Sequence, residues 1–379
     1  MEDTFMQFKN ANIYTERFRF EEGCFSVEDG KFTNILGEPT EDAIDLQGAY
    51  VIPGLIDVHS HGNMGADFSD GDYEGLVRMA KYYGENGITS FAPASMTLPY
   101  EVLEKAFATA RAFVDSKTKG VAALRGIQME GPFFSEAKKG AQNAAYLRKP
   151  DFEAFRKLYD DCGGLVRIVD IAPELPGSAE FIRQASQLCT VSIAHTDANY
   201  EEAAAGVAAG VTHLTHTYNA MSPIHHRKPG VIAACCENEA VSAEIICDGQ
   251  HVHPASVRLA FRLFGAERMV LISDSLRCCG MPNGEYELGG QAVFLKDGLA
   301  RLADGTIAGS ATNLYDCMRL AVSFGIAKED AIRAATYNPA RQIGALNEVG
   351  SIAEGKIADF VICDETLTRK AVYLSGEQI

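Results

Sequence analysis

Hydrophobic residues gather in short runs that alternate with longer stretches of helical period. Each run suits a strand buried on both faces, and the stretches between them place apolar residues every three or four positions, as amphipathic helices do. The runs read YVIPGLIDVHSH, GITSFAPAS, LRGIQMEGP, VRIVDIAPE, TVSIAHT, VTHLTHTYN, VSAEIICDG and MVLISDS, and the helical stretches are 73–86, 100–116, 152–162, 179–188, 201–209 and 254–264. Eight strands with intervening helices predict an α/β fold, a closed (β/α)8 TIM-like barrel over residues 51–345.

The two ends of the chain have a different pattern. Residues 1–50 and 346–379 contain short strand patterns broken by Gly, Asp and Asn. We expect these ends to pair into one small β-sandwich domain beside the barrel. A further β-rich stretch, 284–309, follows the eighth run and predicts a hairpin insertion near the site.

Composition narrows the class of protein. A chain of 379 residues accommodates one barrel of about 250 residues and a small domain. It has no run of about 18 apolar residues, so we expect no membrane span. With 51 acidic and 34 basic side chains its net charge is -17, which argues against nucleic acid or an anionic membrane as partner. The ten cysteines and a start without a secretory pattern predict reduced thiols and a cytoplasmic location.

The segment PGLIDVHSHG carries the first candidate chemistry. His59 and His61 lie two residues apart on a predicted strand, so both imidazoles leave the same face and can bind one metal ion. The alternative is a polar layer around a single ion held elsewhere. His213 precedes His216 by three residues, which predicts the opposite face of that strand and a structural role.

Four polar residues stand at the ends of later runs, where a barrel places its catalytic side chains. Glu130, His195 and His216 are predicted metal ligands, although a carboxylate such as Glu130 can also bind backbone amides. Asp274 is the candidate general base and acid, because a carboxylate beside a metal-bound water can accept its proton and pass it to a leaving amine. The alternative for Asp274 is a helix cap. Imidazole with carboxylate suits Zn, Fe, Co or Mn, and one or two ions are expected.

A substrate site is predicted from residues in nearby loops. His251, after the seventh run, is placed to contact substrate. Arg227 and Lys228 are cations in an acidic protein and form a candidate anion clamp, since guanidinium matches phosphate oxygens bidentately. A solvated loop is the alternative, and His225 and His226 are assigned to that same loop.

Several segments in order resemble the N-acetylglucosamine-6-phosphate deacetylases of the amidohydrolase superfamily over nearly the whole chain. The segments are PGLIDVHSHG, MEGPFFSEAKKGAQN, IAPE, AHTDA, THTYNAMSPIHHRKPG, CDGQHVHP, SDSLRCCGMPNGEYELGG, DGTIAGS, ATYNPAR and GKIADFV. The resemblance implies a metal-dependent hydrolase of amino sugar catabolism. Its substrate would be N-acetyl-D-glucosamine 6-phosphate, its products glucosamine 6-phosphate and acetate, and its nucleophile a metal-activated hydroxide assisted by Asp274.

The resemblance also assigns residues to the substrate. Asn219, Ala220, Arg227 and His251 would line the sugar phosphate pocket, with Arg227 reaching in from the partner subunit of a homodimer. Gln142 replaces a histidine that many relatives carry in the sequence KKGAH and that is thought to contact the acetamide or its oxyanion. An amide can donate a hydrogen bond there but cannot carry the charge of an imidazolium.

Other functions stay open at this level. Dihydroorotase and hydantoinase types use a carboxylated lysine on the fourth strand, and the run VRIVDIAPE has none. A deacetylase of another amino sugar phosphate, such as N-acetylgalactosamine 6-phosphate, is harder to separate. A catalytically silent binding protein of this fold would lack ligands or the base, and this chain retains all of them.

Overall fold

The computed structural model describes residues 5–379, so residues 1–4 of the predicted N-terminal segment lie outside it. Its larger part is a curled parallel sheet, and each of the eight predicted runs contains a strand. The strands form one sheet of three and one of six, in the orders β10-β9-β6 and β11 to β16. Their bounds are β6 Leu55–Asp57, β9 Ile88–Phe91, β10 Ala123–Leu124, β11 Ile127–Met129, β12 Val166–Ile171, β13 Thr190–Ile193, β14 His213–Leu214, β15 Ser242–Ile246 and β16 Met269–Ile272.

Backbone contacts connect the two parallel sheets at two places. A parallel bridge joins Ala94, after β9, to Gln128 of β11. On the other side the Asp274 N–H donates to the His59 carbonyl at 2.9 Å, which links the end of β16 to the end of β6. The carboxyl ends of all these strands therefore lie on one side of the curled sheet.

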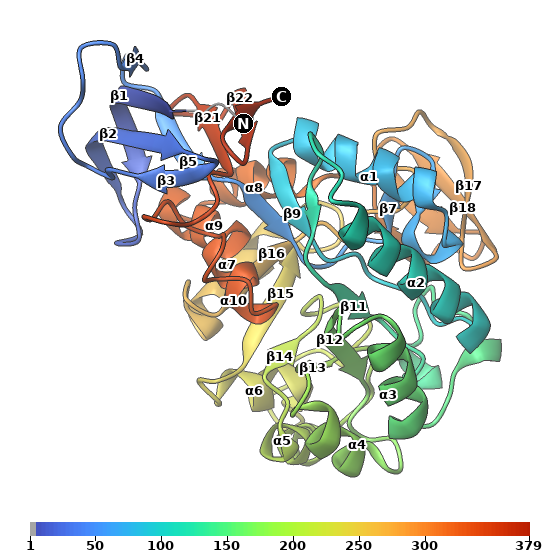
Figure 1. Cartoon of the computed structure of the whole chain (residues 1–379). Helices are drawn as coiled ribbons and strands as arrows, with labels where there is room; N and C mark the ends of the chain where they lie inside the picture. The colour runs from blue at the N-terminus through green and yellow to red at the C-terminus, as the bar shows by residue number, and fades with distance from the viewer. Residues whose placement is uncertain (1–4) are drawn as a thin grey trace.

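Helices follow most of the strands and cover the outer face of the sheet (Figure 1). Side chains cap the first turns of α1, α3, α5, α7 and α8, and at the start of α5 Asn199 and Glu202 form a reciprocal capping box. The predicted helical stretches agree with α1 to α5 and α7, whereas α6 and α8 to α10 were not predicted. The bounds are α1 Tyr73–Glu85, α2 Tyr100–Ser116, α3 Phe152–Asp161, α4 Ser178–Ala185, α5 Tyr200–Ala209, α6 Gly230–Cys236, α7 Pro254–Phe264, α8 Leu314–Ser323, α9 Lys328–Ala335 and α10 Tyr337–Gln342.

Strands from the two ends of the chain share one eight-stranded sheet, in the order β23-β22-β21-β5-β1-β2-β3 with β4 paired to β1. Figure 1 shows the blue N-terminal strands beside the red C-terminal strands. Buried aromatic rings form the core packed against this sheet, and Phe360 stacks on Tyr373 with ring centroids 4.3 Å apart. The bounds are β1 Phe5–Tyr14, β2 Phe20–Glu28, β3 Lys31–Thr33, β4 Ile44–Asp45, β5 Tyr50–Pro53, β21 Phe360–Cys363, β22 Arg369–Leu374 and β23 Glu377–Gln378.

A four-stranded antiparallel sheet occupies the β-rich stretch after β16. Its strands are β17 Gly284–Leu288, β18 Gln291–Lys296, β19 Leu299–Leu302 and β20 Ile307–Ser310. The Ser310 N–H donates to the Asp274 carbonyl at 2.8 Å, which fastens β20 to the end of β16. Short elements complete the chain, namely a hairpin of β7 Gly62–Asn63 and β8 Ala66–Asp67 and the 3-10 turns Phe68–Asp70, Glu136–Lys138 and Ala144–Tyr146. Within residues 5–379 none of the helices has the length and hydropathy needed to cross a bilayer.

Candidate metal centre

Side chains from five different strand ends meet in the middle of the sheet. They form two groups whose members have ligand atoms within 4.8 Å of one another. One group is His59, His61 and Asp274, and the other is Glu130, His195 and His216. All six were singled out from the sequence, and all are buried, with Asp274 the most exposed at 8%.

The second group has the spacing of a coordination shell. The Oε1 atom of Glu130 lies 3.2 Å from the Nε2 atoms of both His195 and His216, and these two nitrogens are themselves 3.2 Å apart. A tetrahedral ion with bonds of about 2.0–2.1 Å sets its ligands about 3.3 Å apart. The three atoms therefore fit one face of such a tetrahedron.

The first group shares Glu130 with the second. His61 Nε2 lies 3.4 Å from Asp274 Oδ1 and 3.3 Å from Glu130 Oε2. His59 Nε2 lies 3.5 Å from Glu130 Oε1 and 3.7 Å from Asp274 Oδ1, and it makes no hydrogen bond within residues 5–379. A buried nitrogen without a hydrogen is an acceptor that needs a partner. Both groups thus fit a cation, and the Glu130 carboxylate lies between them.

Three of these residues have unusual backbone conformations. His195, His216 and Asp274 adopt φ values of 45°, 28° and 48°, in the left-handed region that non-glycine residues rarely occupy. Each lies two residues after the last residue of a parallel strand, so the turn of the chain directs the side chain across the end of the sheet. Neighbouring hydrogen bonds hold the conformation, as where the His216 N–H donates to Glu244.

The electrostatics of the cluster favour positive charge. Burial alone would lower the pKa of His61, but hydrogen bonds with Asp274 and Glu130 raise it to about 10. Burial opposes ionisation of Glu130 as well, yet the surrounding imidazoles hold the pKa of this carboxyl well below its usual range. A field that draws protons onto imidazoles draws a metal cation equally.

Both ends of the Gln142 amide are hydrogen-bonded within the chain. Its Nε2 donates to Glu130 Oε2 at 2.8 Å, and its Oε1 accepts from the Thr97 N–H at 2.7 Å. The side chain is 3% exposed. Its amide therefore fixes the orientation of the carboxylate that both groups share.

Glu244 is a site residue that the sequence did not reveal. It is fully buried on β15, and its Oε2 accepts from His59 Nδ1 at 2.9 Å. Its Oε1 lies 3.0 Å from Nε2 of His213, the histidine predicted to be structural. Burial opposes ionisation of Glu244, but His59 and His213 hold its pKa well below the usual range. The only signal in the sequence was an acidic residue within an apolar run.

A cavity of about 300 Å3 opens over the cluster. Its lining residues include five of the six clustered side chains, all but His59, together with Gln142, His251, Asn219 and Ala220. Residues 306–309, from β20 and the turn before it, form one wall. Asp248 accepts from His251 Nδ1 at 2.7 Å and so orients that imidazole, a contact that was not predicted. Arg227 does not line the cavity, since it lies in an exposed loop where its guanidinium contacts His226.

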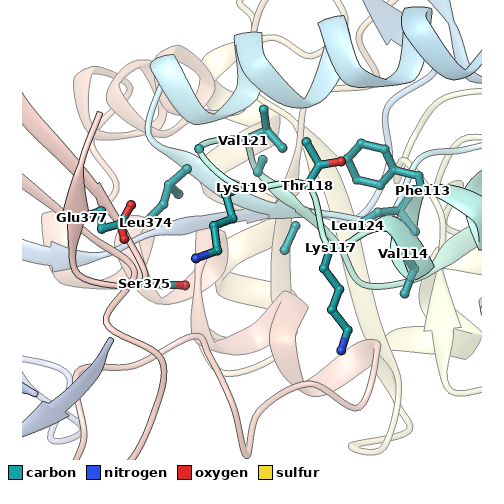
Figure 2. A pocket seen from close by; sticks show the side chains of 13 residues that line it. Phe113, Val114, Lys117, Thr118, Lys119, Val121, Leu124, Leu374, Ser375 and Glu377 are labelled. Atoms are coloured by element: carbon teal, nitrogen blue, oxygen red, sulfur yellow. The ribbon is translucent and has the colours of Figure 1, made fainter. Parts of the chain in front are cut away.

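A second cavity of similar size lies between the loop after α2 and the end of β22 (Figure 2). It is lined by Lys117 and Lys119 from the loop and by Leu374, Ser375 and Glu377 from the end of β22. Its lining includes none of the clustered carboxylates and imidazoles. The chemistry of the molecule is therefore assigned to the cavity over the metal-binding groups.

Known proteins resemble the chain over most of its length. It is 35% identical to N-acetylglucosamine-6-phosphate deacetylase of Bacillus subtilis over 373 residues, which cover 95% of this chain and 94% of the relative. The fold matches that of N-acetyl-D-glucosamine-6-phosphate deacetylase from Mycobacterium smegmatis, solved in complex with N-acetyl-D-glucosamine-6-phosphate. The TM-score is 0.92, the identity is 32%, and 99% of each chain is covered. The Pasteurella multocida enzyme gives a TM-score of 0.92 at 29% identity, over 99% of this chain and 100% of that one.

The family assignment rests on the chain as a whole. The profile of the amidohydrolase family matches residues 50–379, which include all six clustered side chains. Members of this family are metal-dependent, in agreement with the two groups of ligand atoms at the ends of the strands. By sequence and by fold, this chain belongs to the amidohydrolase family.

Proposed function

We propose that this protein hydrolyses the acetamide of N-acetyl-D-glucosamine 6-phosphate to D-glucosamine 6-phosphate and acetate, a step of amino sugar catabolism. The observation that supports it best is the complete buried cluster in a chain that is 35% identical to a deacetylase of this name over 95% of its length. A silent binding protein would not need a full set of buried ligands beside an ionised carboxylate.

The fold proposed for this activity is a closed (β/α)8 barrel over residues 51–345, with the insertion 284–309 beside the site. The hydrogen bond between Asp274 N and His59 O supports closure between the last and first strands. Residues 1–50 and 346–379 form the small β-sandwich domain of this proposal. The ring of Phe32, on the edge strand β3, lies 5.8 Å from the ring of Phe360 on β21, although three strands separate β3 from β21 in the sheet order. This contact supports a sheet that folds over itself.

Glu130, His195 and His216 are the proposed ligands of one divalent ion, and His59 and His61, with Asp274 beside them, are those of a second. When bound by these residues, a divalent ion would supply polarisation of the acetyl carbonyl and would lower the pKa of water to about 7. Zn, Fe, Co and Mn all suit these imidazole and carboxylate donors. Gln142 keeps Glu130 oriented toward both groups, because its amide is anchored on the Thr97 backbone.

Asp274 is the proposed general base and acid. Burial opposes its ionisation, but His61 and His59 lower the pKa of this carboxyl, so it is ready to accept a proton. It takes the proton of the attacking water and delivers it to the amine nitrogen as the C–N bond breaks. Its place on the cavity wall gives it access to that nitrogen.

The sugar phosphate is proposed to lie between His251, Asn219 and Ala220. The phosphate requires a cation, and Arg227 with Lys228 lies in an exposed loop outside the cavity of its own chain. We therefore assign Arg227 to the cavity of the partner subunit in a homodimer. All ten cysteines are free thiols, the state that the reducing cytoplasm maintains, and a cytoplasmic location is proposed.

The test is release of acetate by protein of known metal content. N-acetylglucosamine 6-phosphate, N-acetylgalactosamine 6-phosphate and unphosphorylated N-acetylglucosamine are compared under identical conditions. Turnover confined to the first substrate is the expected result. Preference for the galactosamine ester would identify the other amino sugar phosphate as substrate, and no turnover of any of the three by metal-loaded protein would refute the proposal.

A further inference from the structure

One buried carboxylate contacts a residue of each group of the metal centre on the side that faces away from the cluster. Glu244 lies on the interior side of β15, and none of its surface is exposed. Through Oε2 it accepts from the His59 ring at 2.9 Å and from the His216 N–H at 3.1 Å. Through Oε1 it contacts His213 Nε2 at 3.0 Å. No step proposed above uses this residue.

The four clustered imidazoles are supported very differently on the side that faces away from the cluster. His59 Nδ1 is bonded to the Glu244 carboxylate, and His195 Nδ1 to the Lys138 carbonyl at 2.9 Å. The Nδ1 atoms of His61 and His216 are buried without a hydrogen-bond partner among residues 5–379. Within residues 5–379, His59 is thus the only one of the four whose Nδ1 atom, on the side away from the cluster, is bonded to a carboxylate.

We propose that Glu244 is a positioning residue that fixes the ring of His59 for metal binding, and that it thereby builds the His59, His61 and Asp274 group as a site separable from the other. The inference rests on the proposed metal-dependent function. Because an ionised carboxylate only accepts hydrogen bonds, His59 must donate from Nδ1, and its Nε2 lone pair then faces Glu130 and Asp274. A carboxylate behind a ligating imidazole also raises its basicity as a ligand.

His213 completes the arrangement on the other side of the carboxylate. Its contact with Oε1 fixes the rotation of the Glu244 side chain, so that Oε2 remains directed at His59. The Glu130, His195 and His216 group receives from Glu244 only a bond to the His216 backbone. Loss of the Glu244 side chain should therefore affect the two groups unequally.

The experiment titrates the metal-free protein with Co2+ and follows its visible absorption, with the bound metal counted after gel filtration. The wild type is expected to bind two ions. Glu244→Gln, which keeps the shape but offers one acceptor oxygen, should weaken the second ion about 10- to 100-fold and leave the first unchanged. Glu244→Met, which has no comparable acceptor, should retain one ion. Folding of each variant is checked by circular dichroism.

Asp170→Asn is the matched control. Asp170 is equally buried on β12 but bonds Gln128 and Thr215 and no histidine, so this variant should still bind two ions. In a His59→Ala background, Glu244→Gln should change the affinity of the remaining ion no further, whereas a general packing defect would lower it. Wild-type affinity for both ions in the folded Glu244 variants would overturn the inference. So would a wild type that binds one ion, and acetate release would then still report separately on the proposed function.

Discussion

Asp359 offers a test of how burial sets the pH dependence of stability. It precedes β21 at the join between the terminal sheet and the parallel sheet, is 7% exposed, and accepts at Oδ1 from the Ser375 N–H at 2.8 Å. Burial raises the pKa of its carboxyl from 3.8 to about 6, although that hydrogen bond and Arg125 oppose the shift. The folded protein therefore holds this proton more tightly than the unfolded chain does.

The sign and size of the effect follow from that shift. The stabilising contribution of protonated Asp359 is complete below pH 3.8 and is lost as the pH rises through 6. A shift of about two pKa units corresponds to about 3 kcal/mol at about 1.4 kcal/mol per unit. Asp359→Asn cannot ionise and keeps an oxygen for the Ser375 N–H, while its buried amide hydrogens cost about 1 kcal/mol at every pH. The variant should be about 0.5 kcal/mol less stable than the wild type at pH 4, where part of the wild-type contribution is already lost, and about 2 kcal/mol more stable at pH 8.

Urea unfolding of both proteins between pH 4 and pH 8 measures this difference. Other groups titrate in the same range, but they do so equally in the two proteins and cancel in the comparison. Glu354→Gln, at an exposed position shortly before Asp359, serves as the control and should give a difference that does not vary with pH. A constant difference for Asp359→Asn as well would show that this carboxyl is not perturbed by burial.

Three further predictions concern the site. Asp274→Asn should lower kcat about 10²- to 10⁴-fold with unchanged metal content, as checked by acetate release and metal analysis, and surviving turnover would remove its role as base. Gln142→Leu should lower the free energy of unfolding by about 2–4 kcal/mol in a urea titration, because it leaves the Thr97 N–H and Glu130 without their partner; an unchanged midpoint would contradict those two bonds. Arg227→Gln should raise KM for the phosphorylated sugar about 10- to 100-fold with kcat retained, whereas an equal effect on the unphosphorylated sugar would exclude a phosphate contact.

The parallel strands could be predicted because buried parallel strands are apolar on both faces and leave short, continuous runs in the sequence. Helix α6, Gly230–Cys236, was not predicted because it is only seven residues long and follows an irregular loop. Helices α8 to α10 follow the antiparallel insertion and lie after the last of the eight runs, so the strand pattern did not indicate them.

The clustered residues could be predicted because each ends a run, and the ends of neighbouring parallel strands meet on one side of the sheet. Glu244 could not, because its importance depends on His59, which lies 185 residues away in the sequence. Gln142 was assigned to the substrate site from the resemblance, but its two hydrogen bonds, with Thr97 and Glu130, could not be predicted for the same reason. A sequence pattern locates residues that begin or end elements, whereas contacts across the sheet interior leave no local signal.

The backbone conformation and the buried charges of the site both oppose the stability of the fold. His195, His216 and Asp274 each adopt a left-handed conformation that costs about 1–3 kcal/mol, although the sheet itself would tolerate an extended residue at these strand ends. The same turns bring imidazole and carboxylate atoms together where desolvation penalises every charge. The aromatic core of the terminal sheet, by contrast, gathers side chains whose burial is favourable without partners. The apolar cores therefore stabilise the fold, whereas the cluster destabilises it. The cluster holds its ligand atoms at about the distance that separates two ligands of one metal ion, and this arrangement indicates that the protein binds a cation there.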